Sequence, residues 1–256
     1  MGSHGAHRRF GRVLKALLFD VQGTATDFHS TVCDEARRIS AGRDAGVDWP
    51  DVVRRWRAGY FAALKIASAE APAKAPETAP STGSWVSVHS VYRDVLDTVL
   101  ADAGFIGLTA AERDDLALAW QRLRPWPDVV AGLTRLRRTY VLATLSNADV
   151  SAVVNISKRA GLPWDAIFTA EMAGVFKPDP AAYRMAATYL GLPPGGIMMV
   201  ASHKYDLRAA AQLGFRTAFV ARPLEFGTDG VADVAYEDEF DVNACDFVDL
   251  ADQLVG

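Results

Sequence analysis

Four short apolar runs, each with an amphipathic segment beside it, occupy the second half of this 256-residue chain. Short apolar runs are typical of buried strands, and amphipathic segments with helical spacing are typical of helices that cover a sheet. The runs are residues 141–145, 166–169, 197–201 and 217–220, and the expected helices are 128–138, 150–160, 180–190 and 207–213. This alternation predicts an α/β fold, a Rossmann-like doubly wound parallel sheet with helices on both faces.

A fifth apolar run, residues 13–19, ends at Asp20 and predicts the first strand of the same sheet. From 29 to 125 the pattern changes, because charged and apolar residues recur at helical spacing with no strand pattern. The four helical segments are 30–43, 49–68, 88–103 and 109–123, and a proline-rich surface loop is expected at 70–84. The chain is therefore predicted to have a core of residues 13–28 and 126–256, with an all-helical cap domain of residues 29–125 inserted into it.

Composition restricts the partners of this chain. The net charge is −4 and the pI is about 5.7, so nucleic acid or an anionic membrane has little electrostatic support as a partner. We see no apolar run long enough to span a membrane and no secretory signal in the first residues. The two cysteines, Cys33 and Cys245, lie far apart and form neither a disulfide framework nor a zinc motif. We therefore expect a cytoplasmic protein that acts on a small molecule.

Polar side chains follow the predicted strands. They are Asp20, the pair Ser146 and Asn147, Lys177, the pair Ser202 and His203, and Asp206. Ligands of an open parallel sheet bind at the carboxyl ends of its strands, so these side chains should line one crevice. Each has an ordinary alternative when it is taken singly: Asp20 as a turn residue, Lys177 as a solvated loop lysine, and Thr24, Ser146 or Asp206 as helix caps. Their order along the chain favours a reaction centre.

The segments that carry these residues resemble a known set of motifs. FDVQGT, TLSN, FKPDP and VASHKYD are similar, in this order, to the four motifs of the haloacid dehalogenase superfamily. The resemblance extends from Leu17 to the C-terminus. The helical insertion resembles the cap domain of the 2-haloacid dehalogenases of type II, and WRAGY at residues 56–60 resembles their arginine-bearing cap helix.

This resemblance implies a reaction. Asp20 would attack C2 of a short 2-haloalkanoic acid, expel halide with inversion, and form an ester that water hydrolyses to a 2-hydroxy acid. Lys177 would keep Asp20 ionised, Asp206 would be the base for the water, and Arg57 would meet the departing halide. Arg54 and Arg55 stand beside Arg57, and helical spacing alone does not choose among the three. No metal and no cofactor are implied, because the electrophile is carbon.

Two groups of site residues follow from the resemblance. The catalytic candidates are Asp20, Thr24, Arg57, Ser146, Lys177 and Asp206. The candidates for substrate binding are Gln22, Trp56, Tyr60, Asn147, Tyr183, Ser202 and His203, of which Trp56 and Tyr60 could equally pack the cap.

Two positions depart from the family pattern and leave alternatives open. Phosphatases of the superfamily have a second acid where Gln22 stands, and a glutamine cannot donate and recover a proton at neutral pH. Dehalogenases typically have an aromatic residue there. His203 stands where some dehalogenases have asparagine, and could also be a packed, satisfied histidine. The alternatives are a phosphatase or phosphonate hydrolase, or a catalytically silent binding module. The halogen, the chain length, the enantiomer and the existence of a homodimer stay open.

Overall fold

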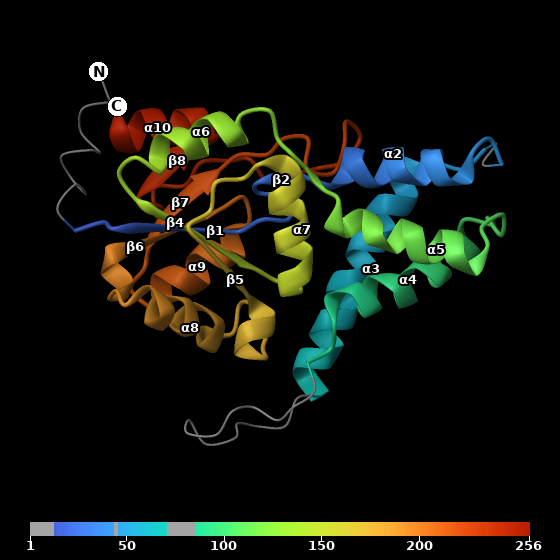
Figure 1. The fold of residues 1–256 in the computed structure, drawn as a ribbon, viewed down its shortest axis with the longest axis horizontal. Helices are drawn as coiled ribbons and strands as arrows, with labels where there is room; N and C mark the ends of the chain where they lie inside the picture. Colours follow the sequence, from blue (N-terminus) through green and yellow to red (C-terminus); the bar gives the residue numbers. More distant parts are fainter. Residues whose placement is uncertain (1–12, 44–45, 71–84) are drawn as a thin grey trace.

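A six-stranded parallel sheet organises the chain, with strand order β5-β4-β1-β6-β7-β8 (Figure 1). The computed structural model describes residues 13–43, 46–70 and 85–256. The strands are β1 (Ala16–Phe19), β4 (Val141–Ser146), β5 (Ala166–Thr169), β6 (Ile197–Ala201), β7 (Arg216–Val220) and β8 (Val242–Ala244). The first strand along the chain thus lies inside the sheet, beside β4 and β6, which places the residue after it at the middle of the carboxyl edge.

Helices cover both faces of the sheet, as the doubly wound prediction requires (Figure 1). In β1, Leu17 and Phe19 point to one apolar cluster and Ala16 and Leu18 to the other, as expected for a strand buried on both sides. The first face is covered by α6 (Val129–Leu136), α7 (Val150–Ala160) and α10 (Phe247–Val255), and the second by α8 (Pro180–Leu190) and α9 (Lys204–Gln212). The predicted fold class is confirmed.

Close contact between α6 and α10 depends on a glycine. A β-carbon at Gly132 would overlap the backbone carbonyl of Phe247. A larger residue there would separate the two helices, and the sheet face beneath them would lose part of its cover.

Four further helices pack together beside the sheet (Figure 1, right). They are α2 (Phe28–Ser40), α3 (Trp49–Glu70), α4 (Val88–Asp102) and α5 (Ala110–Ala117), followed by the 3-10 turn η1 (Leu118–Gln121). Aromatic rings fill their interior: Tyr92 stacks on Trp120 at 3.9 Å and on Tyr60 at 4.4 Å between centroids. Their buried residues join the cluster on the first sheet face without a break, so both parts share one apolar core.

The structure adds elements that the sequence did not reveal. A two-stranded antiparallel ribbon of β2 (Thr26–Asp27) and β3 (Arg124–Pro125) ties the two ends of the helical segment together. Strand β8 and helix α10 were also missed. Three residues are too few for a clear periodic pattern, whereas the helical spacing of Phe247, Leu250, Ala251 and Leu254 could have indicated α10.

Some predicted boundaries shift. Helix α9 begins at Lys204, so Asp206 lies in its first turn, and the alternative that Asp206 is an N-cap is wrong. Helix α2 begins at Phe28, capped by Asp27. Of the proline-rich loop at 70–84, residues 71–84 lie outside the described residues. Within the described ranges, no helix combines the length and apolarity that crossing a membrane needs.

Candidate active site

A lysine bridges two buried aspartates at the carboxyl edge of the sheet. Asp20 follows β1, Asp206 lies in α9 after β6, and Lys177 lies in the loop between β5 and α8. The Lys177 ammonium nitrogen lies 3.1 Å from Asp20 Oδ1 and also donates a hydrogen bond to Asp206 Oδ2. None of the three residues is more than 5% exposed. The alternatives of a turn aspartate and a solvated loop lysine are therefore wrong.

Burial and charge give the two carboxyl groups different proton affinities. Burial raises the pKa of Asp20, but the Lys177 charge and the hydrogen bond to His203 outweigh it and hold this pKa well below its usual range. Burial also raises the pKa of Asp206, where Lys177 offsets it only in part and the negative charge of Asp20 adds to it. Asp20 is thus suited to act as an ionised nucleophile, and Asp206 to accept a proton.

Hydroxyl groups orient the other oxygen of Asp20. Thr24 donates from Oγ1 to Asp20 Oδ2 at 2.8 Å and accepts a hydrogen bond from the Ser202 amide at 2.9 Å. Since Thr24 has one proton, the contact of 3.0 Å between its oxygen and Ser202 Oγ requires Ser202 to donate. Neither Thr24 nor Ser146 caps a helix, so that alternative is wrong for both.

Ser146 ends β4 and Asn147 follows it, beside the same edge. Asn147 fastens the lysine loop, because its amide nitrogen donates to the Lys177 carbonyl at 3.0 Å and its amide oxygen accepts from the Lys177 backbone N–H at 2.7 Å. The Ser146 hydroxyl is buried and has no hydrogen-bond partner among the described residues. Leaving a buried hydroxyl without a hydrogen-bond partner costs free energy. The Ser146 hydroxyl is therefore suited to binding a polar ligand.

Arg57 is the arginine of the WRAGY segment that reaches the site. Its guanidinium donates from Nη1 to Gln22 Oε1 at 2.7 Å and to the Tyr92 hydroxyl. It is only 4% exposed, and no carboxylate lies within 4.0 Å of it among the residues described. Arg54 and Arg55 instead pair with Asp51 near the surface.

Aromatic rings enclose this buried cation. Their centroids lie 4.6–5.7 Å from its central carbon, and they belong to Phe28, Tyr60, Phe61 and Trp120. The Arg57 Nε atom is buried without a hydrogen-bond partner in the described part of the chain. A buried guanidinium without an anionic partner is a ready binding site for an anion.

The remaining predicted aromatic residues divide between cap packing and the site. Trp56 donates from its indole nitrogen to the Tyr92 carbonyl at 2.7 Å and packs inside the helical part. Tyr60 faces Arg57 and donates to the Asn147 carbonyl at 2.8 Å, so it joins α3 to the sheet edge. Tyr183 donates to Asp206 Oδ1. Of the predicted set, Trp56 is the residue whose described contacts all lie within the helical part.

The structure adds Glu225 to the site. It follows β7, is buried, and its Oε1 lies 2.7 Å from His203 Nε2, within hydrogen-bond distance. The other ring nitrogen, Nδ1, lies 3.2 Å from Asp20 Oδ2. Glu225 stands five positions after a predicted strand, so the rule that led to the other residues could have indicated it.

Asp149 is a second addition, and it joins the helical part to the sheet. Its two carboxylate oxygens accept four hydrogen bonds at 2.8–2.9 Å, from the Trp85 indole, the Ser87 hydroxyl and the backbone N–H groups of Val88 and His89. These donors surround the first turn of α4. A carboxylate from the sheet side thus binds the positive end of a cap helix. No linear signal marks this role.

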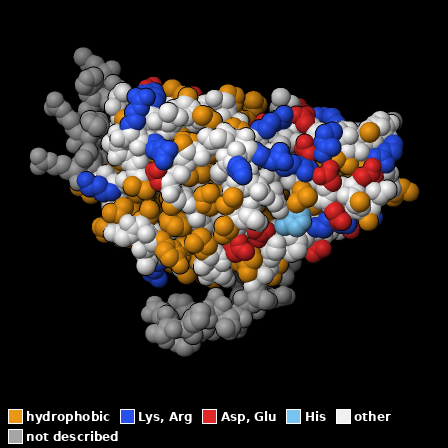
Figure 2. All heavy atoms as spheres, viewed as in Figure 1, with side chains coloured by type: hydrophobic (Ala, Val, Ile, Leu, Met, Phe, Trp, Pro, Cys, Tyr) orange, Lys and Arg blue, Asp and Glu red, His pale blue; other side chains and the backbone are white. Residues whose placement is uncertain are grey.

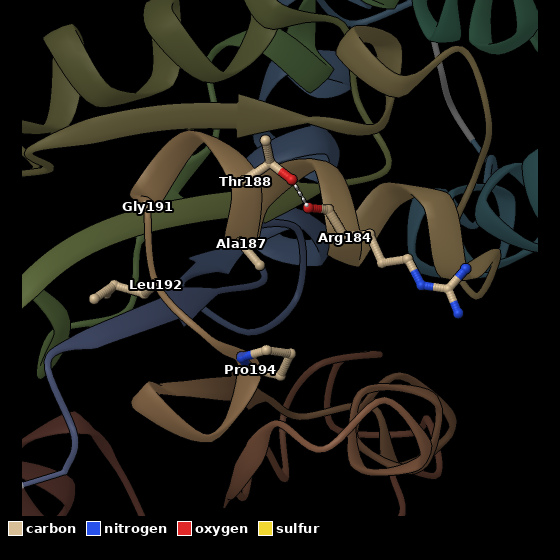
Figure 3. Close-up of a pocket in the computed structure, with 6 residues that line it drawn as sticks. All are labelled: Arg184, Ala187, Thr188, Gly191, Leu192 and Pro194. Carbon is tan, nitrogen blue, oxygen red and sulfur yellow. Dashed lines mark hydrogen bonds between the residues drawn. The ribbon is translucent and has the colours of Figure 1, made fainter. Parts of the chain in front are cut away.

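Of two recesses in the described structure, the smaller adjoins these residues. A recess of about 400 Å³ beside α8 is lined by Arg184, Ala187, Thr188, Gly191, Leu192 and Pro194 (Figure 3). None of the site residues lines it. A cavity of about 10 Å³ is lined by Gln22, Tyr92 and Trp120 among others. The smaller cavity is relevant, because Gln22 contacts Arg57.

No group of three or more His, Cys, Asp or Glu side chains is arranged to hold a metal ion among the described residues. The absence of a metal and of a cofactor in the reaction stays a prediction.

The fold and the site together are those of a hydrolase with a doubly wound parallel sheet and a buried aspartate at the end of its first strand. A sequence model of the haloacid dehalogenase-like hydrolases matches residues 14–214, and the chain belongs to this family.

Individual relatives agree with this assignment. An (S)-2-haloacid dehalogenase of Xanthobacter autotrophicus is 30% identical over 217 residues, which is 82% of this chain and 76% of that protein. The structure of the defluorinating L-2-haloacid dehalogenase Rha0230 is similar with a TM-score of 0.86 and 36% identity, covering 96% of this chain and 97% of that chain. The Xanthobacter autotrophicus L-2-haloacid dehalogenase with chloropropionic acid covalently bound has a TM-score of 0.75 at 26% identity, covering 95% and 99%.

The bridging lysine generates a stability prediction. In Lys177→Met, two buried carboxylates lose their cation, and we expect a loss of about 3–5 kcal/mol in the free energy of unfolding at pH 7. The pKa values of Asp20 and Asp206 should rise above their unfolded values, so the folded variant binds more protons and the loss should shrink as the pH falls toward 5. Urea unfolding at both pH values measures it.

Lys158→Met, an exposed position in α7, is the matched control and should change stability by less than about 0.5 kcal/mol. Equal effects of the two substitutions, or a loss at Lys177 that grows as the pH falls, would contradict the charge arrangement described.

Proposed function

We propose that this protein hydrolyses short 2-haloalkanoic acids to 2-hydroxy acids through an ester on Asp20. The observation that carries the proposal is the buried contact of 3.1 Å between the Lys177 ammonium and Asp20, which keeps this carboxylate ionised inside the protein. The named relatives, which are dehalogenases of 2-haloacids, support the substrate class. No metal and no cofactor take part in the proposed reaction.

In the first step, a carboxylate oxygen of Asp20 attacks C2 of the substrate from the side opposite to the halogen. A bond from oxygen to carbon forms, the carbon–halogen bond breaks, and the configuration at C2 inverts. Halide departs with the bonding electron pair, toward the guanidinium of Arg57, which has no carboxylate partner among the described residues. A fixed cation there stabilises the transition state more than the ground state, because the negative charge on the halogen develops during the step. The unpaired hydroxyl of Ser146 would bind the substrate carboxylate.

In the second step, water attacks the carbonyl carbon of the Asp20 ester. Asp206, whose pKa is raised mainly by burial, accepts a proton from this water, while Lys177 and Tyr183 hold it in place. The bond between the ester oxygen and the Asp20 carbonyl carbon breaks, and the released alkoxide takes up a proton to become the 2-hydroxy acid. The balance is one water consumed, with one halide and one proton released.

The rival activities are less well supported. A phosphatase needs an acid to protonate the leaving alkoxide, and the side chain at that position, Gln22, instead accepts hydrogen bonds from Arg57 and Tyr92 at its amide oxygen. A silent binding module has no need of three buried ionised side chains, and burying charge is costly.

We propose a two-part organisation for the site. Residues 13–28 and 126–256 form the core that holds Asp20, Lys177 and Asp206, and residues 29–125 form the cap that supplies Arg57. The ribbon of β2 and β3 lies where the chain passes between these parts.

The partners are a haloacid substrate and a halide ion, and the setting is the cytoplasm, in agreement with two free cysteines. We also propose a homodimer. Hydrophobic side chains gather on one face over α8 (Figure 2), and Tyr189 in α8 is 63% exposed.

Halide release tests the activity. Ion detection of fluoride, chloride and bromide across small 2-haloacids should show halide and 2-hydroxy acid in equal amounts. Asp20→Asn should lower the rate to the blank, because an amide is a poor nucleophile for carbon. A parallel phosphate-release assay should be negative, and chelator should not change the rate. Phosphate release without halide release, or a rate that chelator abolishes and magnesium restores, would refute the proposal.

The assignment of Arg57 has a test of its own. Arg57→Gln should reduce kcat/KM for halide release by about 10²–10³-fold, as loss of one preorganised charge donor typically does. Arg54→Gln and Arg55→Gln on the same helix are matched controls and should stay within about twofold, because both arginines pair with Asp51 instead. Similar losses in all three variants, with unchanged thermal unfolding, would show that Arg57 has no special role.

A further inference from the structure

His203 is a buried side chain of the site that the mechanism above does not use. Its ring lies between two carboxylates: Nδ1 is 3.2 Å from Asp20 Oδ2, and Nε2 is 2.7 Å from Glu225 Oε1. An ionised carboxylate only accepts hydrogen bonds, so both ring nitrogens must carry protons for both contacts to form. With Asp20 and Glu225 both ionised, the two contacts together favour an imidazolium at this position.

Two neighbouring residues, Gly23 and Tyr205, keep the His203 ring and the Glu225 carboxylate in these positions. Gly23 has a φ of +92°, and a β-carbon there would overlap Glu225 Oε1 and approach His203 Cε1 to 3.3 Å. Tyr205 stacks on the imidazole ring with centroids 5.8 Å apart. Glycine thus both permits the turn after Asp20 and leaves space for the carboxylate.

The charged and titratable groups that face His203 are Asp20 after β1, Glu225 after β7, and Tyr205 on its own helix. Burial lowers the pKa of His203, but the charge of Glu225 and the hydrogen bonds to both carboxylates outweigh it and raise this pKa well above its usual range. The ring is the second cation at Asp20, after Lys177 on the opposite oxygen.

The two oxygens of Asp20 have different partners. Oδ1 contacts the ammonium of Lys177, which is shared with Asp206, whereas Oδ2 receives the Thr24 hydroxyl at 2.8 Å and faces His203. The oxygen with fewer fixed donors, Oδ1, is the one free to attack carbon. After attack, Oδ2 becomes the carbonyl oxygen of the ester, and it already has two donors directed at it.

We propose, resting on the dehalogenase function above, that His203 forms an oxyanion site for hydrolysis of the ester, with Glu225 as its positioning residue. When water adds to the Asp20 carbonyl carbon, the π electron pair of the carbonyl moves to Oδ2, and the imidazolium and Thr24 stabilise this charge. Collapse restores the carbonyl and breaks the bond to Oδ1, which leaves with the product. His203 keeps its proton throughout.

Glu225 has a defined task in this scheme. Once Asp20 is an ester, it no longer carries the negative charge that favours a protonated His203. Glu225 is then the remaining anionic partner of the ring, and it keeps His203 protonated until water hydrolyses the ester. A third buried carboxylate in the site is otherwise unexplained.

The test separates the two steps by rapid quench with a chloro or bromo acid at pH 7. In Glu225→Gln, the first turnover should release one halide per enzyme at close to the wild-type rate, because Lys177 and Thr24 still keep Asp20 ionised. Steady-state turnover should then fall by about 10²-fold, and the Asp20 ester should accumulate in the intact mass. Its hydrolysis should slow as the pH rises from 6 to 8, where an unassisted histidine loses its proton, while the wild-type rate stays flat.

Glu239→Gln is the matched control, an exposed glutamate that pairs with Arg208 at 2.8 Å, and it should behave as wild type. If Glu225→Gln does not fold, His203→Phe, which keeps a ring but has no donor for Asp20 Oδ2, should show the same burst and ester. Turnover within twofold of wild type without ester would overturn the inference, as would a slowed first turnover. Failure of the wild type to release halide from any haloacid would instead refute the dehalogenase function itself.

Discussion

The contact of Lys177 with two buried aspartates is the constraint that organises the molecule. Charges of this kind are stable away from water only when each partner is held in place. The sheet provides this, because β1 delivers Asp20, β6 leads into the helix that carries Asp206, and Asn147 at the end of β4 fastens the backbone of Lys177. The fold is thus a means of holding these charges where a substrate can reach them.

The cap completes the site rather than only covering it. Arg57 comes from α3, and one of its two polar partners, Gln22, comes from the loop after β1. Asp149 and Tyr60 cross the same boundary through hydrogen bonds. Residues from both parts therefore meet around the position where halide would leave, so movement between the parts would alter the chemistry as well as the access to it.

The sequence predicted what depends on local order along the chain. Asp20, Ser146, Lys177 and Asp206 each follow a strand with clear apolar periodicity, so their convergence could be predicted from the rule for parallel sheets. Tyr92 and Asp149 could not be found in this way, because their roles arise from contacts between segments 35 or more positions apart. The choice of Arg57 over its neighbours, and the three-residue strand β8, likewise depended on packing that no local pattern encodes.

The covalent route can be examined by one turnover in water enriched in heavy oxygen, with enzyme in excess over haloacid. Hydrolysis at the carbonyl carbon of Asp20 predicts that one heavy oxygen appears in the peptide containing Asp20, while the first 2-hydroxy acid released contains ordinary oxygen from the enzyme. Heavy oxygen found in the first product, with an unlabelled Asp20 peptide, would mean that water attacks the substrate directly, and would contradict the account given for this site.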